Sequence, residues 1–238
     1  MHKPYKCLPQ EALKLIACAT MFIDHFGAAI VPLIPSPYME EIYYTCRIIG
    51  RLAYPIYAFL IAQGVRHTRK PWQYLLRLGI GAVISEVPFD LLFMGRLTLE
   101  YQNVMLTLLL GASALMAWKK QKNPWFKAVT VAFFAGLAEL CQTDYGAAGV
   151  LMICVFGLVE KFWLQCLGLF LCNLLIMDAD MVFFGQLIPI QLFSLPSMLF
   201  IGLYSGGKLT RNRVLQWFFY LFYPAHILFL WVFQGFLW

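Results

Sequence analysis

Long apolar runs, separated by short polar segments, follow one another along the chain of 238 residues. Their approximate limits are 13–33, 45–65, 72–93, 103–118, 125–142, 145–159, 162–177, 183–204 and 214–236. Each run is long enough, or nearly so, to cross a bilayer, and the pattern predicts an all-α, polytopic membrane protein with about nine transmembrane helices. Because the runs leave no room for a soluble domain, we expect residues 1–238 to form a single transmembrane domain.

The charges of the loops orient these predicted helices. Cationic segments, such as 66–70, alternate along the chain with acidic ones, such as 40–41. By the positive-inside rule, this alternation predicts a multi-pass membrane protein with its amino terminus in the cytoplasm and its carboxyl terminus outside.

Composition narrows the class of protein further. With 61% hydrophobic and only 13% charged residues, the chain is not a water-soluble domain, and its partner is the lipid bilayer. The net charge of +6 is concentrated in the loops and therefore does not indicate nucleic acid binding. The seven cysteines form no CxxC pair and no Cys/His cluster, so no metal is expected.

A lysine and a histidine share one face of the first predicted helix. His25 follows Lys14 by eleven residues, about three helical turns, which places the two side chains roughly 16 Å apart. His226 lies thirteen residues beyond Arg213 in the last predicted helix, so we expect its ring at the depth of His25. A histidine inside a membrane helix is explained either by an interhelical hydrogen bond or by a functional site.

Asp24 directly precedes His25. Consecutive residues are about 100° apart around a helix, so the two side chains are not expected to form a direct acid–base dyad. We expect Asp24 to face another helix and to pair there with an arginine or an amide.

Two arginines and two carboxylates form a predicted ladder. Arg47 and Arg51 are four residues apart in the second run, as are Glu86 and Asp90 in the third, so each pair lies on one helical face. In an antiparallel hairpin, residues at equal depth have positions with a constant sum, which matches Arg51 with Glu86 and Arg47 with Asp90. Two interpretations of this ladder are open. Either its ion pairs only allow the four charges to be buried, or one carboxylate also positions or activates a reacting group.

Two further sets of polar residues complete the candidate site. The first set is cationic and consists of Lys14, Arg66, Arg69 and Lys70. These residues either only satisfy the positive-inside rule or also bind the phosphates of a polyanionic cofactor. The second set, expected to line the site, consists of Asn103, Asp144, Tyr145 and Tyr223.

Several of these motifs resemble a known family. The runs LKLIACATMFIDHFG, GRLAYPIYAFLIAQG, DYGAAGVL and FYLFYPAH resemble the TraX family of integral membrane proteins, which is associated with acetylation of the pilin amino terminus. The spacing of Lys14 and His25 is also similar to the K/R-x10-H motif of the wider membrane acyltransferase-3 superfamily, and Arg66 and Arg69 match its RxxR motif. In that superfamily the histidine is the proposed catalytic residue, and the arginines bind the phosphates of acyl-CoA.

The resemblance implies a membrane-embedded acyltransferase of the inner (cytoplasmic) membrane with acetyl-CoA as donor. His25 would act as general base, and Asp24, His226 and Glu86 would belong to the catalytic group. The acceptor would be a hydroxyl or an amine, carried by a protein amino terminus, a glycan or a lipid. Two alternatives stay open, a proton-coupled small-molecule transporter and a scaffold subunit without chemistry.

Overall fold

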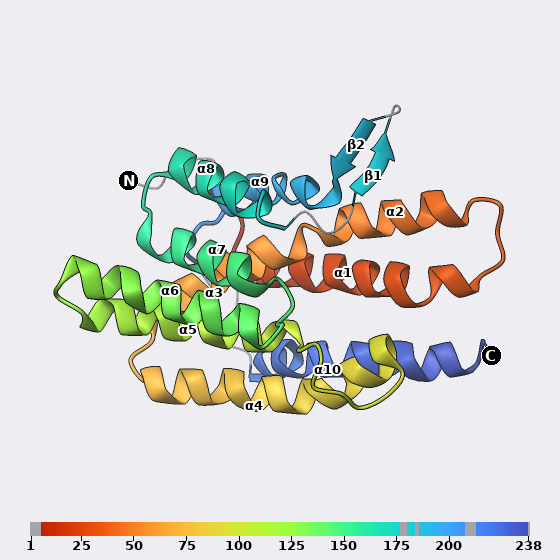
Figure 1. Cartoon of the computed structure of the whole chain (residues 1–238), viewed down its shortest axis with the longest axis horizontal. Helices are drawn as coiled ribbons and strands as arrows, with labels where there is room; N and C mark the ends of the chain where they lie inside the picture. The colour runs from red at the N-terminus through yellow and green to blue at the C-terminus, as the bar shows by residue number, and fades with distance from the viewer. Residues whose placement is uncertain (1–5, 177–179, 184–185, 208–212, 238) are drawn as a thin grey trace. The chain divides into compact units, whose positions relative to one another are not determined.

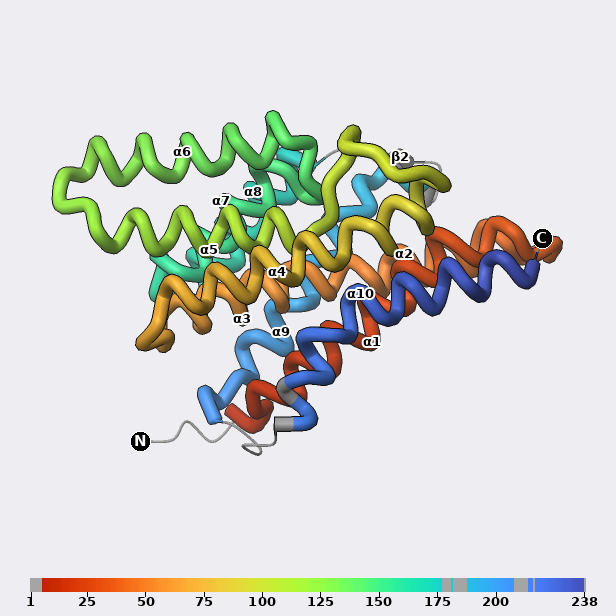
Figure 2. Tube along the Cα trace, turned by 90° about the horizontal axis from the view of Figure 1, so that it is seen from below, coloured from red at the N-terminus to blue at the C-terminus, as the bar shows by residue number. Residues whose placement is uncertain are grey.

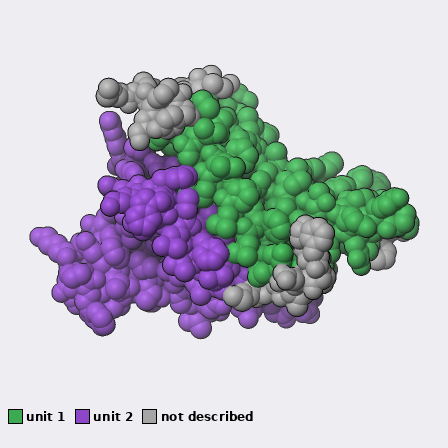
Figure 3. Space-filling view, turned by 90° about the horizontal axis from the view of Figure 1, so that it is seen from above, with its two compact units in different colours: residues 1–57, 91–95, 177–238 green, residues 58–90, 96–176 purple. Residues whose placement is uncertain are grey.

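The computed structural model describes residues 6–176, 180–183, 186–207 and 213–237, and it is mostly helical (Figure 1). The chain divides into two compact units, which Figure 3 distinguishes by colour. Unit 1 consists of Met1–Tyr57, Leu91–Gly95 and Met177–Trp238, and unit 2 of Ala58–Asp90 and Arg96–Ile176. Each unit is described by itself below.

Unit 1 is built on three helices, α1 (Gln10–Ala29), α2 (Met39–Gly50) and α10 (Arg213–Gly235). Helix α1 packs against both α2 and α10, and Figure 2 shows α10 following α1 along much of its length. The Lys14 ammonium lies 4.9 Å from the centre of the Phe219 ring, near the beginning of both α1 and α10. The smaller elements of unit 1 are the 3₁₀-helices Val31–Leu33 and Ile190–Ser194, the helix α9 (Ser197–Gly202) and the antiparallel strands β1 (Asp180–Phe183) and β2 (Gln186–Pro189).

Two glycines bring α1 and α2 into close contact. A Cβ atom at Gly27 would overlap the Cβ atom of Cys46, and a Cβ atom at Gly50 would overlap the side chain of Asp24. Small residues allow helix backbones to approach closely in membrane proteins, because lipid gives no hydrophobic driving force for association. Position 50 is therefore part of the surroundings of Asp24.

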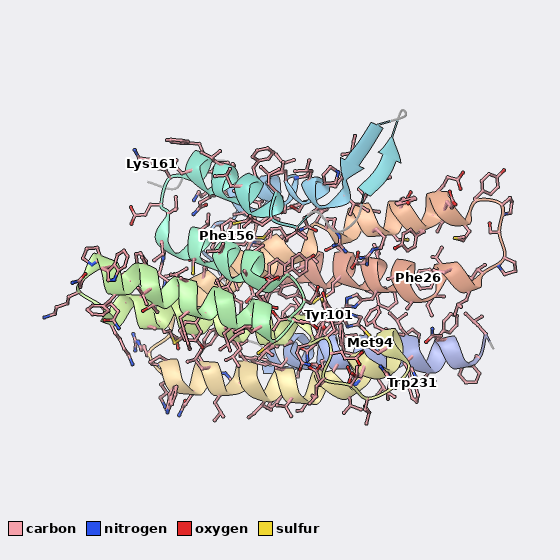
Figure 4. All side chains as sticks on the ribbon, viewed as in Figure 1. Phe26, Met94, Tyr101, Phe156, Lys161 and Trp231 are labelled. Atoms are coloured by element: carbon pink, nitrogen blue, oxygen red, sulfur yellow. The ribbon has the colours of Figure 1, made fainter. Side chains whose placement is uncertain are left out.

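Unit 2 is a helical bundle centred on α5 and α7. Helix α5 packs against α4, α6 and α7, and α7 packs in turn against α6 and α8. Phe156, labelled in Figure 4, is fully buried in this bundle, with its ring edge-on to Phe59 at 5.8 Å. The helices are α4 (Pro71–Phe89), α5 (Val104–Lys120), α6 (Pro124–Leu140), α7 (Gly146–Leu158) and α8 (Phe162–Asn173), while α3 (Ala53–His67) begins in unit 1 and ends in unit 2.

Local sequence explains where several of these helices begin. The Asn103 side chain accepts a hydrogen bond from the Met105 amide at 2.9 Å, and Asn123 does the same for Trp125 at 2.8 Å. Each asparagine is thus the N-cap of its helix and satisfies an amide that has no partner within the helix. Pro71 and Pro124 occupy the first turn, where the missing N–H of proline costs nothing.

Apart from the β1–β2 hairpin, the helical, membrane-like architecture agrees with the sequence prediction, but two of the expected runs are not single helices. The run 45–65 breaks between α2 and α3, where Pro55 has no N–H to donate to the carbonyl of Arg51. The run 183–204 contains Pro189 and Pro196, and it forms strand, 3₁₀-helix and the short α9 instead of one spanning helix.

Three segments of the described chain are long and apolar enough to cross a membrane, namely Gln10–Leu33, Met39–His67 and Trp217–Gly235. Shorter apolar helices occur at Gly146–Leu158, Phe162–Asn173 and Ile190–Gly202. The first and last of the long segments carry the two histidines of the candidate site.

Candidate functional site

Two histidines from opposite ends of the sequence meet in unit 1. The Nδ1 atom of His25, in α1, lies 2.8 Å from the Nε2 atom of His226, in α10. The ring planes differ by only 5° and the ring centres are 5.0 Å apart, so the rings lie end to end in one plane and not face to face. The two rings are therefore at the same depth, as their spacing along the sequence predicts.

An apolar, largely aromatic shell surrounds this histidine pair. Phe93 and Tyr223 lie edge-on to His25, with ring centres 5.4 and 6.1 Å from it, and Phe222 stacks on His226 at 4.7 Å. His25 is 9% exposed and His226 is 5% exposed. In such surroundings a hydrogen bond is electrostatically stronger than it is in water.

A pocket opens in unit 1 next to this shell. Its lining comes from the π-helical segment Asp90–Met94 and from the end of α10, and Met94 and Trp231, both labelled in Figure 4, are part of it. Phe93 both lines the pocket and contacts the His25 ring. The lining side chains are mostly apolar, with Gln234 among them, and Phe93 joins the pocket to the surroundings of His25.

Asp24 binds both arginines of the predicted ladder. Its Oδ2 atom accepts a hydrogen bond from Arg47 Nη1 at 2.8 Å, and its two oxygens accept from Arg51 Nη2 at 2.9 and 3.1 Å. Arg51 also donates to Oε1 of Gln191 at 3.2 Å. The expectation that Asp24 faces another helix and pairs with an arginine is confirmed, and Asp24 makes no dyad with His25.

The predicted partners of the two arginines are wrong. Glu86 accepts from the side-chain amide of Asn103, and from its backbone N–H at 3.4 Å, while Asp90 Oδ2 accepts from the Thr98 amide at 2.8 Å. The constant-sum rule assumes two straight, continuous helices. One helix breaks after Arg51, and the other becomes a π-helix at Asp90–Met94, so the assumption fails at both ends.

Asn103 organises a second polar cluster, in unit 2. It caps α5, holds Glu86 and donates to the Ala82 carbonyl at 2.9 Å. Asp144 accepts from the Tyr101 hydroxyl at 3.1 Å. Tyr145 adopts a left-handed backbone conformation, with φ of 65°, immediately before α7.

The cationic residues of unit 2 gather where α3 and α5 end. Arg66 donates to the Gly157 carbonyl at 3.3 Å, and Lys119 donates to the Val65 carbonyl at 3.1 Å, while Arg69 and Lys70 are exposed. Partial burial, together with the nearby charge of Arg66, lowers the pKa of Lys119. Lys119 directly follows the predicted run 103–118, and its place in the sequence does not mark it as a site residue.

Comparison with known families adds an independent line of evidence. The model of the family described as TraX protein matches residues 9–234. The chain belongs to the TraX family. The match contains His25, His226 and Asp24, and it confirms the resemblance drawn from the sequence motifs.

This TraX protein is also similar to a curated relative. It is 30% identical over 230 residues to the probable fimbrial assembly protein FimC, serogroup H1, of Dichelobacter nodosus, which covers 90% of this chain and 91% of the relative. No solved structure matches the chain.

Two hydrogen-bond partners in the site of this TraX protein were not predicted from the sequence. Gln191, the partner of Arg51, lies in a predicted apolar run where nothing in the sequence pairs it with an arginine, and the Phe222 carbonyl, which lies 2.7 Å from His226 Nδ1, gives no signal in the sequence. Within the described ranges, no group of three His, Cys, Asp or Glu residues could hold a metal ion.

Proposed function

We propose that this TraX protein is a multi-pass acyltransferase of the inner membrane, with its amino terminus in the cytoplasm. It would transfer an acyl group, most simply acetyl, from cytoplasmic acyl-CoA to an amine or hydroxyl reached from within the membrane or from outside. The observation that supports this proposal is the buried pair His25–His226, which places a hydrogen-bonded imidazole inside an apolar shell of a TraX chain.

In this reaction His25 is the general base. As the acceptor nitrogen or oxygen attacks the thioester carbonyl, His25 takes the proton of the acceptor. The bond between the carbonyl carbon and the CoA sulfur then breaks, and the thiolate leaves with the proton that His25 returns. No oxidant, reductant or further reactant is needed.

The donor would be held by cations at the cytoplasmic ends of the helices. Arg66, Arg69 and Lys70, all in unit 2, would bind phosphates of CoA, and Lys14 is the candidate cation of unit 1. We add Lys119 to this set, because its ammonium lies at the helix ends that also carry Arg66. Asn103, Asp144, Tyr145 and Glu86 would line the path in unit 2.

The relative supports one class of acceptor. It is named a probable fimbrial assembly protein, so we propose a protein amino terminus of a fimbrial or pilin-like subunit as the first acceptor to test. A glycan or a lipid are the other acceptors to include. Membership of the TraX family gives no support to the transporter alternative.

The test uses purified protein in lipid vesicles with labelled acetyl-CoA and candidate acceptors. Wild-type protein should release CoA and label the acceptor, whereas His25→Ala and His25→Gln should lower turnover by about 10²–10⁴-fold and keep CoA affinity. Glu100→Gln, which alters an exposed ion pair with Arg96, is the matched control and should behave as wild type. Normal turnover in folded His25→Ala protein would refute the proposal.

A further inference from the structure

We infer that His226 is a positioning residue that fixes the tautomer of His25, so that Nε2 of His25 is the atom that takes the proton. The catalytic consequence rests on the proposed function, but the tautomer itself follows from hydrogen-bond chemistry alone.

The Phe222 carbonyl oxygen lies 2.7 Å from His226 Nδ1. A carbonyl oxygen can only accept a hydrogen bond, so His226 Nδ1 must carry a hydrogen. Phe222 is four residues before His226 in α10, and its oxygen has two lone pairs, so it can serve the helix and the ring together. The carbonyl therefore sets the protonation of Nδ1 in His226.

A neutral imidazole carries one N–H, so Nε2 of His226 is an acceptor. The 2.8 Å contact between this atom and Nδ1 of His25 then requires the hydrogen to be on His25. Neutral His25 consequently keeps its lone pair on Nε2. Across the described residues, the structure gives this Nε2 atom no hydrogen-bond partner, which leaves it available for an acceptor group.

The opposite arrangement would need a positively charged His226 that donates through Nε2. Such a charge would be buried among the rings of Phe22, Phe222 and Tyr223, which offer no compensating carboxylate. Burying an ionised group in apolar surroundings is costly unless it is paired. The neutral arrangement is therefore the one that the geometry favours.

This arrangement has a direct consequence for proton transfer. When His25 accepts a proton at Nε2, its Nδ1–H remains hydrogen-bonded to His226, so the new positive charge already faces an acceptor. The ring orientation is also held in place before the reaction. In metal sites and catalytic triads, a carboxylate or a backbone carbonyl often plays this orienting part; here a neutral imidazole anchored on Phe222 does so.

The tautomers can be measured without any assay of activity. The chain has four histidines, and with His2 and His67 replaced by glutamine, only His25 and His226 contribute imidazole signals to the ¹⁵N spectrum of protein in lipid. We expect both rings to be neutral and protonated at Nδ1, with coupling across the hydrogen bond. A His25 ring protonated at Nε2 would overturn the inference, whatever the activity of the protein.

Two substitutions at His226 test the positioning role. In His226→Gln the amide oxygen can occupy the place of Nε2 and accept from His25, whereas the shorter side chain of His226→Asn does not reach it. We expect kcat to fall about 10–100-fold in His226→Asn, as for other orienting partners, with the KM for acetyl-CoA unchanged, and to be largely rescued in His226→Gln. Equal losses in both folded variants would overturn the positioning role.

The results separate the two proposals. If the tautomers are as inferred but folded His25→Ala protein retains turnover, then the proposed function fails and the assignment of the tautomer stands. If His25→Ala is inactive but His25 is protonated at Nε2, the base is retained and the inference about His226 fails.

Discussion

Asp24 and His25 are consecutive residues of α1, yet they bind two different helices. Asp24 accepts hydrogen bonds from Arg47 and Arg51 at the end of α2, and His25 is hydrogen-bonded to His226 of α10. Because the two side chains leave the helix about 100° apart, these contacts together fix the rotation of α1 about its axis. The charged contact thus holds the helix in the orientation that presents the imidazole to its partner.

The first prediction concerns the charge balance at Asp24. In Asp24→Asn, two guanidinium groups lose the carboxylate that they share, and we expect the free energy of unfolding to fall by about 3–5 kcal/mol. Denaturant unfolding of the protein in mild detergent would measure the change. Glu100→Gln removes a carboxylate from an exposed ion pair and should cost at most about 1 kcal/mol. Equal stability of the two variants would contradict a structural role for Asp24.

The second prediction concerns close packing beside the same carboxylate. A Cβ atom at Gly50 would overlap the Asp24 side chain, so Gly50→Ala should lower stability by about 1–3 kcal/mol and reduce turnover with it. Gly136, in α6, has no atom within 4 Å of such a Cβ atom. Gly136→Ala should therefore be neutral or stabilising by up to about 1 kcal/mol, through helix propensity. The melting temperatures of both variants provide the comparison.

The third prediction concerns the donor. Arg66→Ala, Arg69→Ala and Lys119→Ala should each weaken CoA binding, by about tenfold or more for a charge-assisted contact, and should make the affinity less sensitive to salt. Lys14→Ala tests the corresponding residue of unit 1. Isothermal titration with CoA at two salt concentrations measures both effects, and Arg96→Ala is the control of equal charge. Unchanged affinity in all four variants would leave these residues as determinants of topology alone.

The fourth prediction compares two helix caps. Asn123→Ala should cost about 1 kcal/mol, which is the usual value of an N-cap side chain. Asn103→Ala loses the same kind of cap, and it also removes the side-chain donor to the Glu86 carboxylate and to the Ala82 carbonyl, so a further cost of about 1–3 kcal/mol is expected. The difference between the two unfolding free energies measures these two contacts together. A difference of zero would show that neither contact of the Asn103 side chain stabilises the protein beyond its cap.

Residue counting along the sequence predicted that His25 and His226 lie at one depth, and it succeeded because each helix is continuous between its first cationic residue and its histidine; the direct contact of the two rings was not predicted. Neither Lys14 to His25 nor Arg213 to His226 crosses a break, although Pro224 lies inside the second interval. Helix geometry also predicted that Asp24 pairs with an arginine or an amide of another helix, because Asp24 and His25 lie on different faces of α1.

Residue counting did not predict that Arg47 and Arg51 are the partners of Asp24. Pro55 breaks the predicted second helix after Arg51, and a π-helical turn at Asp90–Met94 changes the face on which carboxylates lie. The contribution of Phe222 is made by a backbone carbonyl, which every residue has, so no side-chain pattern marks it. Lys119 was visible as a loop charge, but only the packing of α5 brings it to the Val65 carbonyl.

The direction of α1 and α10 has a consequence for the whole chain. The contact between Lys14 and Phe219, near the start of both helices, and the contact between His25 and His226, further along each, show that α1 and α10 run parallel. Two parallel helices that both cross a bilayer begin on the same side of it, so the chain between them must cross an odd number of times. With the two helices themselves added, the total number of crossings is then also odd, and the segment before α1 lies on the opposite side of the bilayer from the segment after α10.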